Sequence, residues 1–167
     1  LLFENAIKNG VKKFIIIGSG YEYGLSCLKY KKIPVNASLL PNSSYALSKA
    51  VSSIVLQQWA QENKIKMKYI RLFHVYGDGE DPKRFWPSLK KQALKGGDFY
   101  MTKGEQLRDF THVSMVVEHV IKELNFIKIK PGKPIVTNFG SGKTQTLKNF
   151  ALKWWKYFGA EGKIYFG

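Results

Sequence analysis

The sequence is poor in cysteine, in acidic residues and in long apolar runs, and each shortage excludes a class of protein. Cys27 is the only cysteine in 167 residues, so no disulfide forms within the chain. No run approaches the roughly 20 apolar residues of a membrane-spanning helix. The first residues lack an initiator Met and the basic start of a signal peptide. We therefore expect a cytoplasmic protein with no membrane partner, whose chain begins inside a longer protein.

Acidic residues are outnumbered, with 12 Asp and Glu against 27 Lys and Arg, which gives a net charge of +15. A charge of this size favours an anionic partner such as a phosphate, a nucleotide sugar or a nucleic acid. The lysines are scattered and lack the interleaved aromatic and glycine pattern of an RNA-recognition sheet. Nucleic acid is therefore not expected, and a solvated basic surface is the simplest interpretation.

Apolar residues repeat at helical spacing in several segments, with short apolar runs between them. Segment 18–41, which contains glycines and prolines, has no such period and is typical of an active-site loop. Alternating helices and strands indicate a largely parallel α/β sheet. We expect helices near 3–7, 44–59, 85–94, 113–124 (with Ser114 as its cap) and 147–158, and strands near 14–17, 67–73, 135–138 and 163–166.

Tyr45 and Lys49 lie one turn apart on the expected helix that follows the irregular segment. A positive charge one turn away favours the anion of a phenol, which can then act as a general acid or base. The same spacing also fits a tyrosine at the edge of the core beside a solvated lysine. The pair alone leaves both interpretations open.

The context of this pair resembles a known family. A strand ending in Ser19, a Tyr-Gly pair at 23–24 and a Tyr-x-x-x-Lys helix are similar to the active-site half of the extended short-chain dehydrogenases/reductases, the NAD-dependent epimerase/dehydratase family that acts on nucleotide sugars. Later segments agree in order. Residues 71–77 resemble the family's Arg-x-x-Asn-x-Tyr-Gly strand, with His74 in place of Asn; 104–113 and 138–142 resemble its Gly-x-x-x-Arg-Asp-Phe/Tyr-x-x-Val and Asn-x-Gly-x-Gly segments.

The resemblance implies roles for particular residues. Tyr45 is the acid/base, Lys49 supports it and binds the cofactor ribose, and Ser19 bonds the reacting sugar oxygen. Arg108 holds the nucleotide diphosphate, although a surface ion pair with Asp109 or Glu105 is the alternative. The full sets are Ser19, Tyr45 and Lys49 for catalysis; Tyr45, Lys49, Leu72 and Phe73 for the cofactor; Ser19, Gly20, Tyr21, His74 and Arg108 for the substrate; no metal ligands are implied.

The reaction implied is hydride transfer at a sugar carbon. Gly20 and Tyr21 stand where the 4,6-dehydratases carry an Asp-Glu pair, so dehydration is disfavoured. Epimerisation and reduction of a 4-keto sugar both remain open. The alternative is a catalytically inactive fragment or a polyanion-binding module that has merely inherited Tyr45 and Lys49.

The glycine-rich cofactor fingerprint of the family is missing. Gly18-Ser19-Gly20 follows a strand, but the third glycine and the ribose-binding acid do not follow at the required spacing. The resemblance implies NAD or NADP as cofactor, a nucleotide-sugar substrate, a homodimer in the complete protein, and a partial Rossmann-like parallel sheet with helices on both faces. We expect residues 1–78 to form the C-terminal half of the cofactor domain and 79–167 a mainly substrate-binding region, returning to the core near 108–125.

Overall fold

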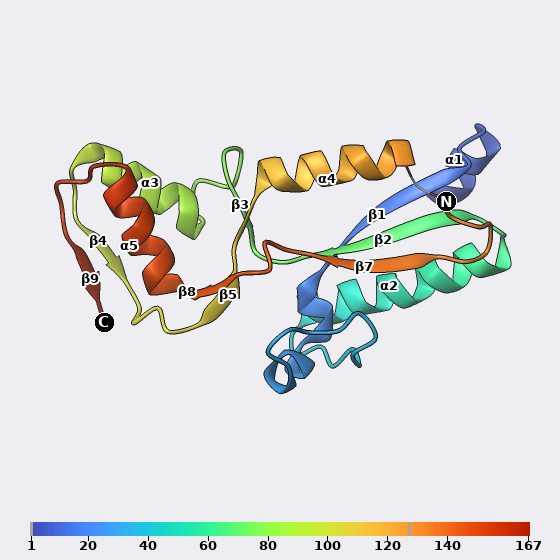
Figure 1. Cartoon of the computed structure of the whole chain (residues 1–167), viewed down its shortest axis with the longest axis horizontal. Helices are drawn as coiled ribbons and strands as arrows, with labels where there is room; N and C mark the ends of the chain where they lie inside the picture. The colour runs from blue at the N-terminus through green and yellow to red at the C-terminus, as the bar shows by residue number, and fades with distance from the viewer. Residues whose placement is uncertain (1, 127) are drawn as a thin grey trace. The chain divides into compact units, whose positions relative to one another are not determined.

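The computed structural model describes residues 2–126 and 128–167, and the chain divides into two compact units. Unit 1 comprises Leu1–Phe73 and Glu118–Phe139, and unit 2 comprises His74–Val117 and Gly140–Gly167. Each unit is therefore assembled from two separate stretches of chain, as the colours of Figure 1 show.

Unit 1 is built on a parallel sheet of β1 (Lys13–Ser19), β2 (Lys66–Leu72) and β7 (Ile135–Phe139), in the order β1-β2-β7. Parallel neighbours require crossover connections, and the helices of these crossovers cover the faces of the sheet. Helix α2 (Ser44–Glu62) follows one face in Figure 1. The expected parallel α/β fold is confirmed.

The alternation of side chains along β2 assigns a helix to each face. Arg71 points to α2, where its guanidinium donates to the Ser53 hydroxyl at 3.3 Å. Lys68, three residues earlier and on the opposite face, forms an ion pair with Glu123 of α4 (Val113–Phe126). The sheet of unit 1 is therefore covered on both faces, as the sequence predicts.

Helix α1 (Leu2–Lys8) is short and depends on aromatic packing. The Phe3 ring lies 5.4 Å from the rings of both Phe14 in β1 and Trp59 in α2, measured between centroids. These rings border the apolar cluster at the amino ends of the strands. Its members are Ala60, Ile65 and Met67 at the centre, with Ile7, Phe14, Ile16, Leu56 and Trp59 around them.

Helix α2 buries small side chains and exposes large ones. Its face against the sheet contributes Ala46, Ala50, Ser53 and Ala60, each at most 3% exposed. Such small residues let a helix approach a sheet closely. The large apolar residues that mark the helix in the sequence lie mostly on the other side and are at least half exposed: Leu47, Val51, Ile54 and Val55.

The segment after β1 is more regular than the sequence predicts, because it contains the 3-10 helices η1 (Gly20–Tyr23) and η2 (Leu25–Lys29). Gly24 joins them with a φ of 49° and forms an isolated bridge with Leu40. A Cβ at Gly24 would lie 1.8 Å from the Leu40 carbonyl oxygen. Only glycine fits this position, which explains the Gly of the Tyr-Gly pair in physical terms.

Unit 2 has an aromatic core between short paired strands. Leu89 and Ala93 of α3 pack with Ala151 and Trp155 of α5. The rings of Trp86 and Trp154 meet edge to face at 4.7 Å. The elements are helices α3 (Phe85–Lys95) and α5 (Leu147–Tyr157), parallel pairs β3 (Val75–Tyr76) with β6 (Thr111–His112) and β4 (Phe99–Met101) with β9 (Ile164–Phe166), and antiparallel pair β5 (Leu107–Asp109) with β8 (Thr144–Thr146).

The start of α4 corrects one expectation from the sequence. Ser114 is already the second residue of the helix and is not its cap. The Ser114 N–H donates to Nδ1 of His112 at 3.3 Å, and the Ser114 hydroxyl lies 2.8 Å from the same nitrogen. The imidazole of His112 therefore satisfies a backbone donor of the first turn in place of a serine.

Candidate active site

Ser19 is the last residue of β1 and caps the 3-10 helix η1 that follows. Its Oγ accepts a hydrogen bond from the Tyr21 N–H at 3.2 Å, and its own N–H donates to Oε1 of Glu22 at 2.8 Å. This reciprocal pair is a capping box, which holds the side chain in one orientation. Because a backbone donor already occupies one lone pair of Oγ, the hydroxyl hydrogen can be donated to another acceptor.

Tyr45 lies in the first turn of α2, which begins after the N-cap residue Ser43. Its side chain is 53% exposed, and its ring meets that of Tyr21 edge to face with centroids 6.0 Å apart. The Nζ of Lys49 lies 5.9 Å from the centroid of the Tyr45 ring. The expected helix therefore places the phenol and the ammonium on one side, and the Tyr21 ring connects them with the Ser19 segment.

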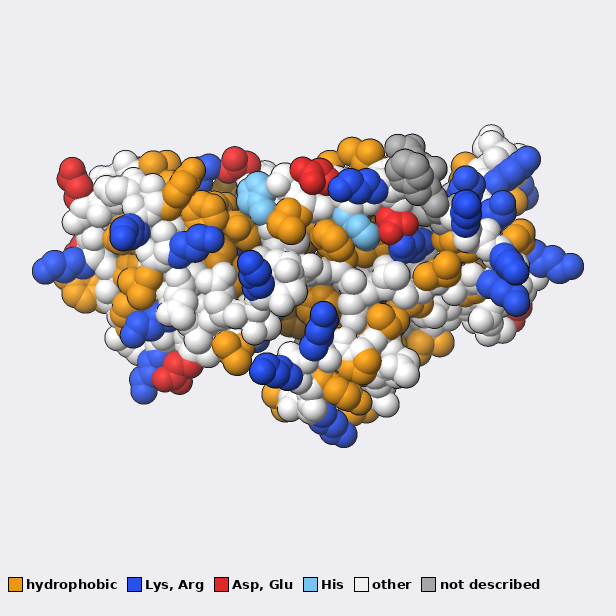
Figure 2. All heavy atoms as spheres, viewed as in Figure 1, with side chains coloured by type: hydrophobic (Ala, Val, Ile, Leu, Met, Phe, Trp, Pro, Cys, Tyr) orange, Lys and Arg blue, Asp and Glu red, His pale blue; other side chains and the backbone are white. Residues whose placement is uncertain are grey.

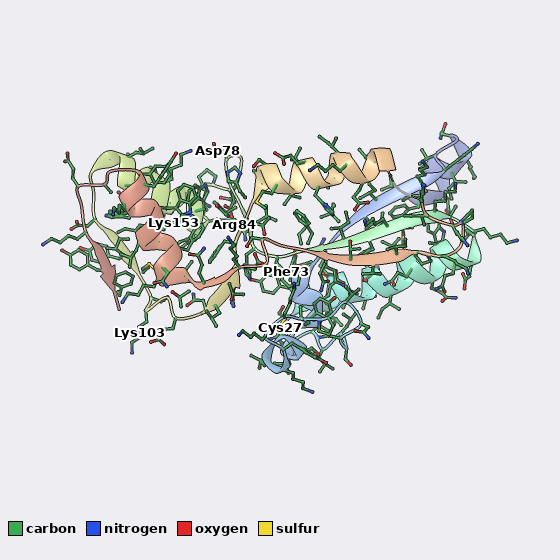
Figure 3. The ribbon with its side chains drawn as sticks, in the orientation of Figure 1. Cys27, Phe73, Asp78, Arg84, Lys103 and Lys153 are labelled. Atoms are coloured by element: carbon green, nitrogen blue, oxygen red, sulfur yellow. The ribbon has the colours of Figure 1, made fainter. Side chains whose placement is uncertain are left out.

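The carboxyl ends of the three parallel strands meet at this same edge of the sheet. Ser19 pairs in register with Leu72, and Leu72 pairs with Phe139. Phe73, labelled in Figure 3, directly follows β2, and its ring packs against Gly20. A Cβ added to Gly20 would lie only 2.5 Å from Cε1 of the Phe73 ring, so no larger residue fits at position 20 without displacing that ring. The structure thus gathers Ser19, Gly20 and the two expected cofactor residues, Leu72 and Phe73, at one edge of unit 1.

A buried polar network lies directly beneath Ser19. The carboxylate of Glu22 is fully buried and accepts from the Tyr69 hydroxyl at 2.8 Å and from Nε of Arg71 at 2.7 Å, besides the Ser19 N–H. Arg71 also donates to the hydroxyl of Tyr23 at 2.8 Å. That hydroxyl donates to Oδ1 of Asn138 in β7 at 2.7 Å.

The sequence assigns no role to this network, although a glutamate in a loop motif and an arginine in an apolar strand are its visible signals. Burial raises the pKa of Tyr69 above its ordinary value, and the hydrogen bond to Glu22 raises it further. Burial by itself lowers the pKa of Arg71, but its contacts with Glu22 and Tyr23 outweigh burial, so its pKa is raised. Both groups therefore remain protonated donors to Glu22 at neutral pH.

His74 and Arg108 belong to unit 2, where the structure brings them near each other. His74 has a φ of 27°, and its ring lies 6.1 Å from that of Phe110. Burial, then the charge of Arg108, lowers the pKa of His74 from 6.5 to about 4. His74 is therefore a neutral imidazole at physiological pH.

Asp109 stabilises a turn of unit 2. Its carboxylate accepts from the N–H of Ser141 and from the N–H of Gly142, both at 2.8 Å. Arg108, one residue earlier in β5, donates from Nη1 to the carbonyl of Leu107 at 2.9 Å. The two segments that resemble family motifs, 104–113 and 138–142, thus meet through Asp109.

Part of the positive charge lies at the amino ends of the strands of unit 1. Lys13 begins β1 and Lys66 begins β2, at the amino ends of the strands, and Lys133 precedes β7. Figure 2 shows blue side chains gathered over the end of unit 1 where α1 lies. The high net charge is therefore not a property of the Ser19 edge alone.

An open parallel sheet with helices on both faces, and with its polar and aromatic groups at the carboxyl ends of the strands, defines an α/β protein of the nucleotide-binding type. Ligands of such sheets bind at that edge. The sequence matches the model of the NAD dependent epimerase/dehydratase family over residues 1–136. The chain belongs to this family.

Curated relatives and solved structures agree with this membership. The chain is 24% identical to a putative UDP-arabinose 4-epimerase of Arabidopsis thaliana, covering 99% of this chain and 42% of that protein. It is 29% identical to the dTDP-4-dehydro-6-deoxyglucose reductase of Escherichia coli, over 87% of this chain and 46% of the relative. Its structure is similar to the crystal structure of UDP-glucose 4-epimerase with UDP-glucose from Thermotoga maritima, with a TM-score of 0.79 and 26% sequence identity. The match covers 99% of this chain and 54% of that one. The chain spans about half the length of these proteins.

Proposed function

We propose that the protein carrying this chain is an NAD(P)-dependent enzyme that epimerises a nucleotide sugar or reduces its 4-keto form. The observation that carries the proposal is the grouping of Ser19, Tyr45 and Lys49 around the carboxyl end of β1. Membership of the family and the names of the relatives support the same reaction class.

Tyr45 is the proposed acid/base. Acting as the base, its phenol oxygen takes the proton of a sugar hydroxyl while the hydride leaves the same carbon, which becomes a ketone. In the reverse direction it returns the proton to the carbonyl oxygen. Ser19 donates its hydroxyl hydrogen to that oxygen and stabilises the charge that develops on it.

NAD(P), when bound, accepts or supplies the hydride. The residues of this edge fit the ribose and nicotinamide half of such a cofactor. Tyr45 is half exposed, Lys49 offers an ammonium, and Leu72 at the end of β2 and Phe73 directly after it carry apolar side chains. The fingerprint for the cofactor diphosphate is not found in these 167 residues. We propose that a preceding part of the complete protein supplies it.

Arg108 is the proposed ligand of the substrate diphosphate, because a guanidinium binds phosphate oxygens in a planar, bidentate manner. His74 is the proposed neutral partner for the sugar or phosphate, and Gly20 and Tyr21 line the substrate side of Ser19. The residues at 20 and 21 carry no carboxylate, so dehydration remains disfavoured.

The proposed assembly is a homodimer that buries the large apolar side chains of α2. Leu47, Val51, Ile54 and Val55 support this proposal, since each is at least half exposed.

Within the described part of the chain, no helix is both long and apolar enough to cross a membrane. A cytoplasmic location remains a prediction.

The test is turnover of nucleotide sugars and their 4-keto forms by the complete protein, with Tyr45→Phe as the diagnostic variant. Loss of the phenolic proton carrier is expected to lower kcat by about 10²- to 10⁴-fold. Tyr100→Phe is the matched control, because Tyr100 is 73% exposed on β4 and is expected to leave kcat unchanged. Full activity of Tyr45→Phe, or no turnover and no binding of NAD(P) by the complete wild-type protein, rejects the proposal.

A further inference from the structure

We infer that Glu22 and Arg71 form a positioning pair, which holds the Ser19 hydroxyl in register with the Tyr45 helix for the reaction. The inference rests on the proposed function of Ser19 and Tyr45. In this inference neither Glu22 nor Arg71 contacts the substrate or the cofactor. They act through the groups that they hold.

The geometry requires a carboxylate at position 22. Oε1 of Glu22 accepts the Ser19 N–H at 2.8 Å, and Oε2 accepts Nε of Arg71 at 2.7 Å. Both partners can only donate, so each oxygen of the side chain must be an acceptor. A glutamine of the same shape offers one acceptor and one donor, and would leave either Ser19 or Arg71 facing a second donor.

Arg71 extends the connection to α2. Its second terminal nitrogen donates to the hydroxyl of Ser53 at 3.3 Å. Ser53 follows Lys49 by four residues and Tyr45 by eight, so the three lie along one side of the helix. A chain of hydrogen bonds therefore runs from the Ser19 N–H through Glu22 and Arg71 to the helix that presents Tyr45.

Because both members of this ion pair are buried, a gain in stability does not explain well why the pair is there. Glu22 is 0% and Arg71 4% exposed, and the loss of hydration of two buried charges offsets much of their attraction. Buried ion pairs are instead able to specify one arrangement of the groups around them. Here the group fixed is the capping box of Ser19, whose Oγ accepts the Tyr21 N–H.

The experiment compares Glu22→Gln with Tyr69→Phe in the complete protein. Glu22→Gln replaces the carboxylate itself. Tyr69→Phe removes a hydroxyl that interacts with Glu22 and Ser53, but it leaves the bonds from Ser19 and Arg71 to the carboxylate in place. We expect Glu22→Gln to lower kcat about 10- to 100-fold with KM nearly unchanged, because misplaced catalytic groups weaken the transition state alone. Tyr69→Phe should retain kcat within about twofold, since it leaves both obligate donors paired.

A purely structural role predicts a different result, namely equal kcat per folded molecule in Glu22→Gln, Tyr69→Phe and wild type, and this would overturn the inference. Ser53→Ala keeps the test valid if Glu22→Gln does not fold. It removes one hydroxyl at the α2 end of the chain of hydrogen bonds, and we expect kcat to fall about 3- to 10-fold with KM unchanged. An unchanged kcat in Ser53→Ala counts against the pair.

Hydrogen exchange separates failure of this inference from failure of the proposed function. In Glu22→Gln the amides of residues 19–21 should exchange about 10-fold faster or more than in wild type, while a segment of unit 2 such as α5 does not change. Tyr69→Phe should resemble wild type. If the wild-type protein turns over no nucleotide sugar, the proposed function fails, and unchanged exchange in Glu22→Gln would separately reject the positioning pair.

Discussion

His74 combines an unusual backbone angle with a lowered side-chain pKa. Its φ of 27° lies in a region where Asn, Asp and His occur far more often than other residues with side chains. This explains why His can replace the Asn of the family pattern without breaking the turn. The burial that accompanies this position lowers the pKa of His74 to about 4, so the ring adds no charge beside Arg108 at neutral pH.

The lowered pKa of His74 predicts an acid-sensitive contribution to stability. Between pH 6.5 and about 4 the unfolded chain binds a proton at His74 that the folded chain does not, so the free energy of unfolding falls as the pH falls through this window. His74→Asn, which tolerates the same backbone angle, should remove this part of the loss. Urea unfolding at several pH values from 7 to 4 measures it.

The range above pH 7 is the control for the comparison of wild type with His74→Asn. Above about pH 7 His74 is neutral in both states, so any difference between wild type and His74→Asn must become independent of pH there. Parallel pH profiles for the two proteins across the acid range would contradict the lowered pKa.

At the same scale, the sequence predicts Ser19, Tyr45 and Lys49 as site residues but assigns no role to Glu22 and Arg71. Glu22 and Arg71 lie 49 residues apart, and Tyr23 and Asn138 lie 115 apart. Periodicity and motif spacing describe neighbours along the chain, whereas these pairs form only when parallel strands are brought side by side. The roles assigned to the site residues themselves remain predictions.

Among the elements, helix α2 is clearly predicted by the sequence, but the face with which it packs on the sheet is not. Helical spacing predicts a helix near 44–59, and the structure has it at Ser44–Glu62, three residues longer at its end. Spacing does not show which side meets the sheet, because Ala46, Ala50 and Ser53 form as regular a stripe as the larger residues do. Close packing against β1 and β2 selects the small side chains, so the larger apolar stripe remains exposed.

The cap of α2 gives a prediction about stability. The Ser43 hydroxyl accepts the Ala46 N–H at 3.2 Å, so Ser43→Ala should lower the free energy of unfolding by about 1 kcal/mol. The measurement is the urea midpoint of the variant against wild type. Because the first turn carries Tyr45, activity should fall together with helix stability.

Ser52→Ala on the same helix is the matched control. Ser52 is exposed, and its hydroxyl donates to the Ser48 carbonyl, which already belongs to the helix. Alanine has the higher helix propensity, so this change should leave stability within about 0.5 kcal/mol or raise it slightly. Equal losses in Ser43→Ala and Ser52→Ala would show that capping is not the cause.

At the scale of the whole molecule, the exposed stripe of α2 predicts how the protein assembles. A charge placed in the centre of the stripe by Ile54→Asp should weaken the proposed dimer about 100-fold or more, because a carboxylate would be buried without a partner. Light scattering on the eluting protein, with dilution, measures the dissociation constant. The sequence predicts this dimer only through its resemblance to the family.

Leu94→Asp is the corresponding control on α3. Leu94 is 63% exposed, comparable with Ile54 at 58%, but it lies in unit 2 outside the proposed interface. It should leave the dimer intact. A monomeric wild-type protein, or equal effects of the two substitutions, would exclude assembly through α2.

The division of unit 1 into two stretches of chain also governs the order in which the protein can fold during synthesis. Strand β7, which supplies Asn138, pairs with β2 but is separated from it by all of residues 74–117. The ribosome must therefore deliver most of unit 2 before the sheet of unit 1 can be completed. Until then one edge of β2 lacks its partner strand and the Tyr23 hydroxyl lacks Asn138, so the nascent chain exposes an unpaired strand edge that a chaperone could protect from aggregation.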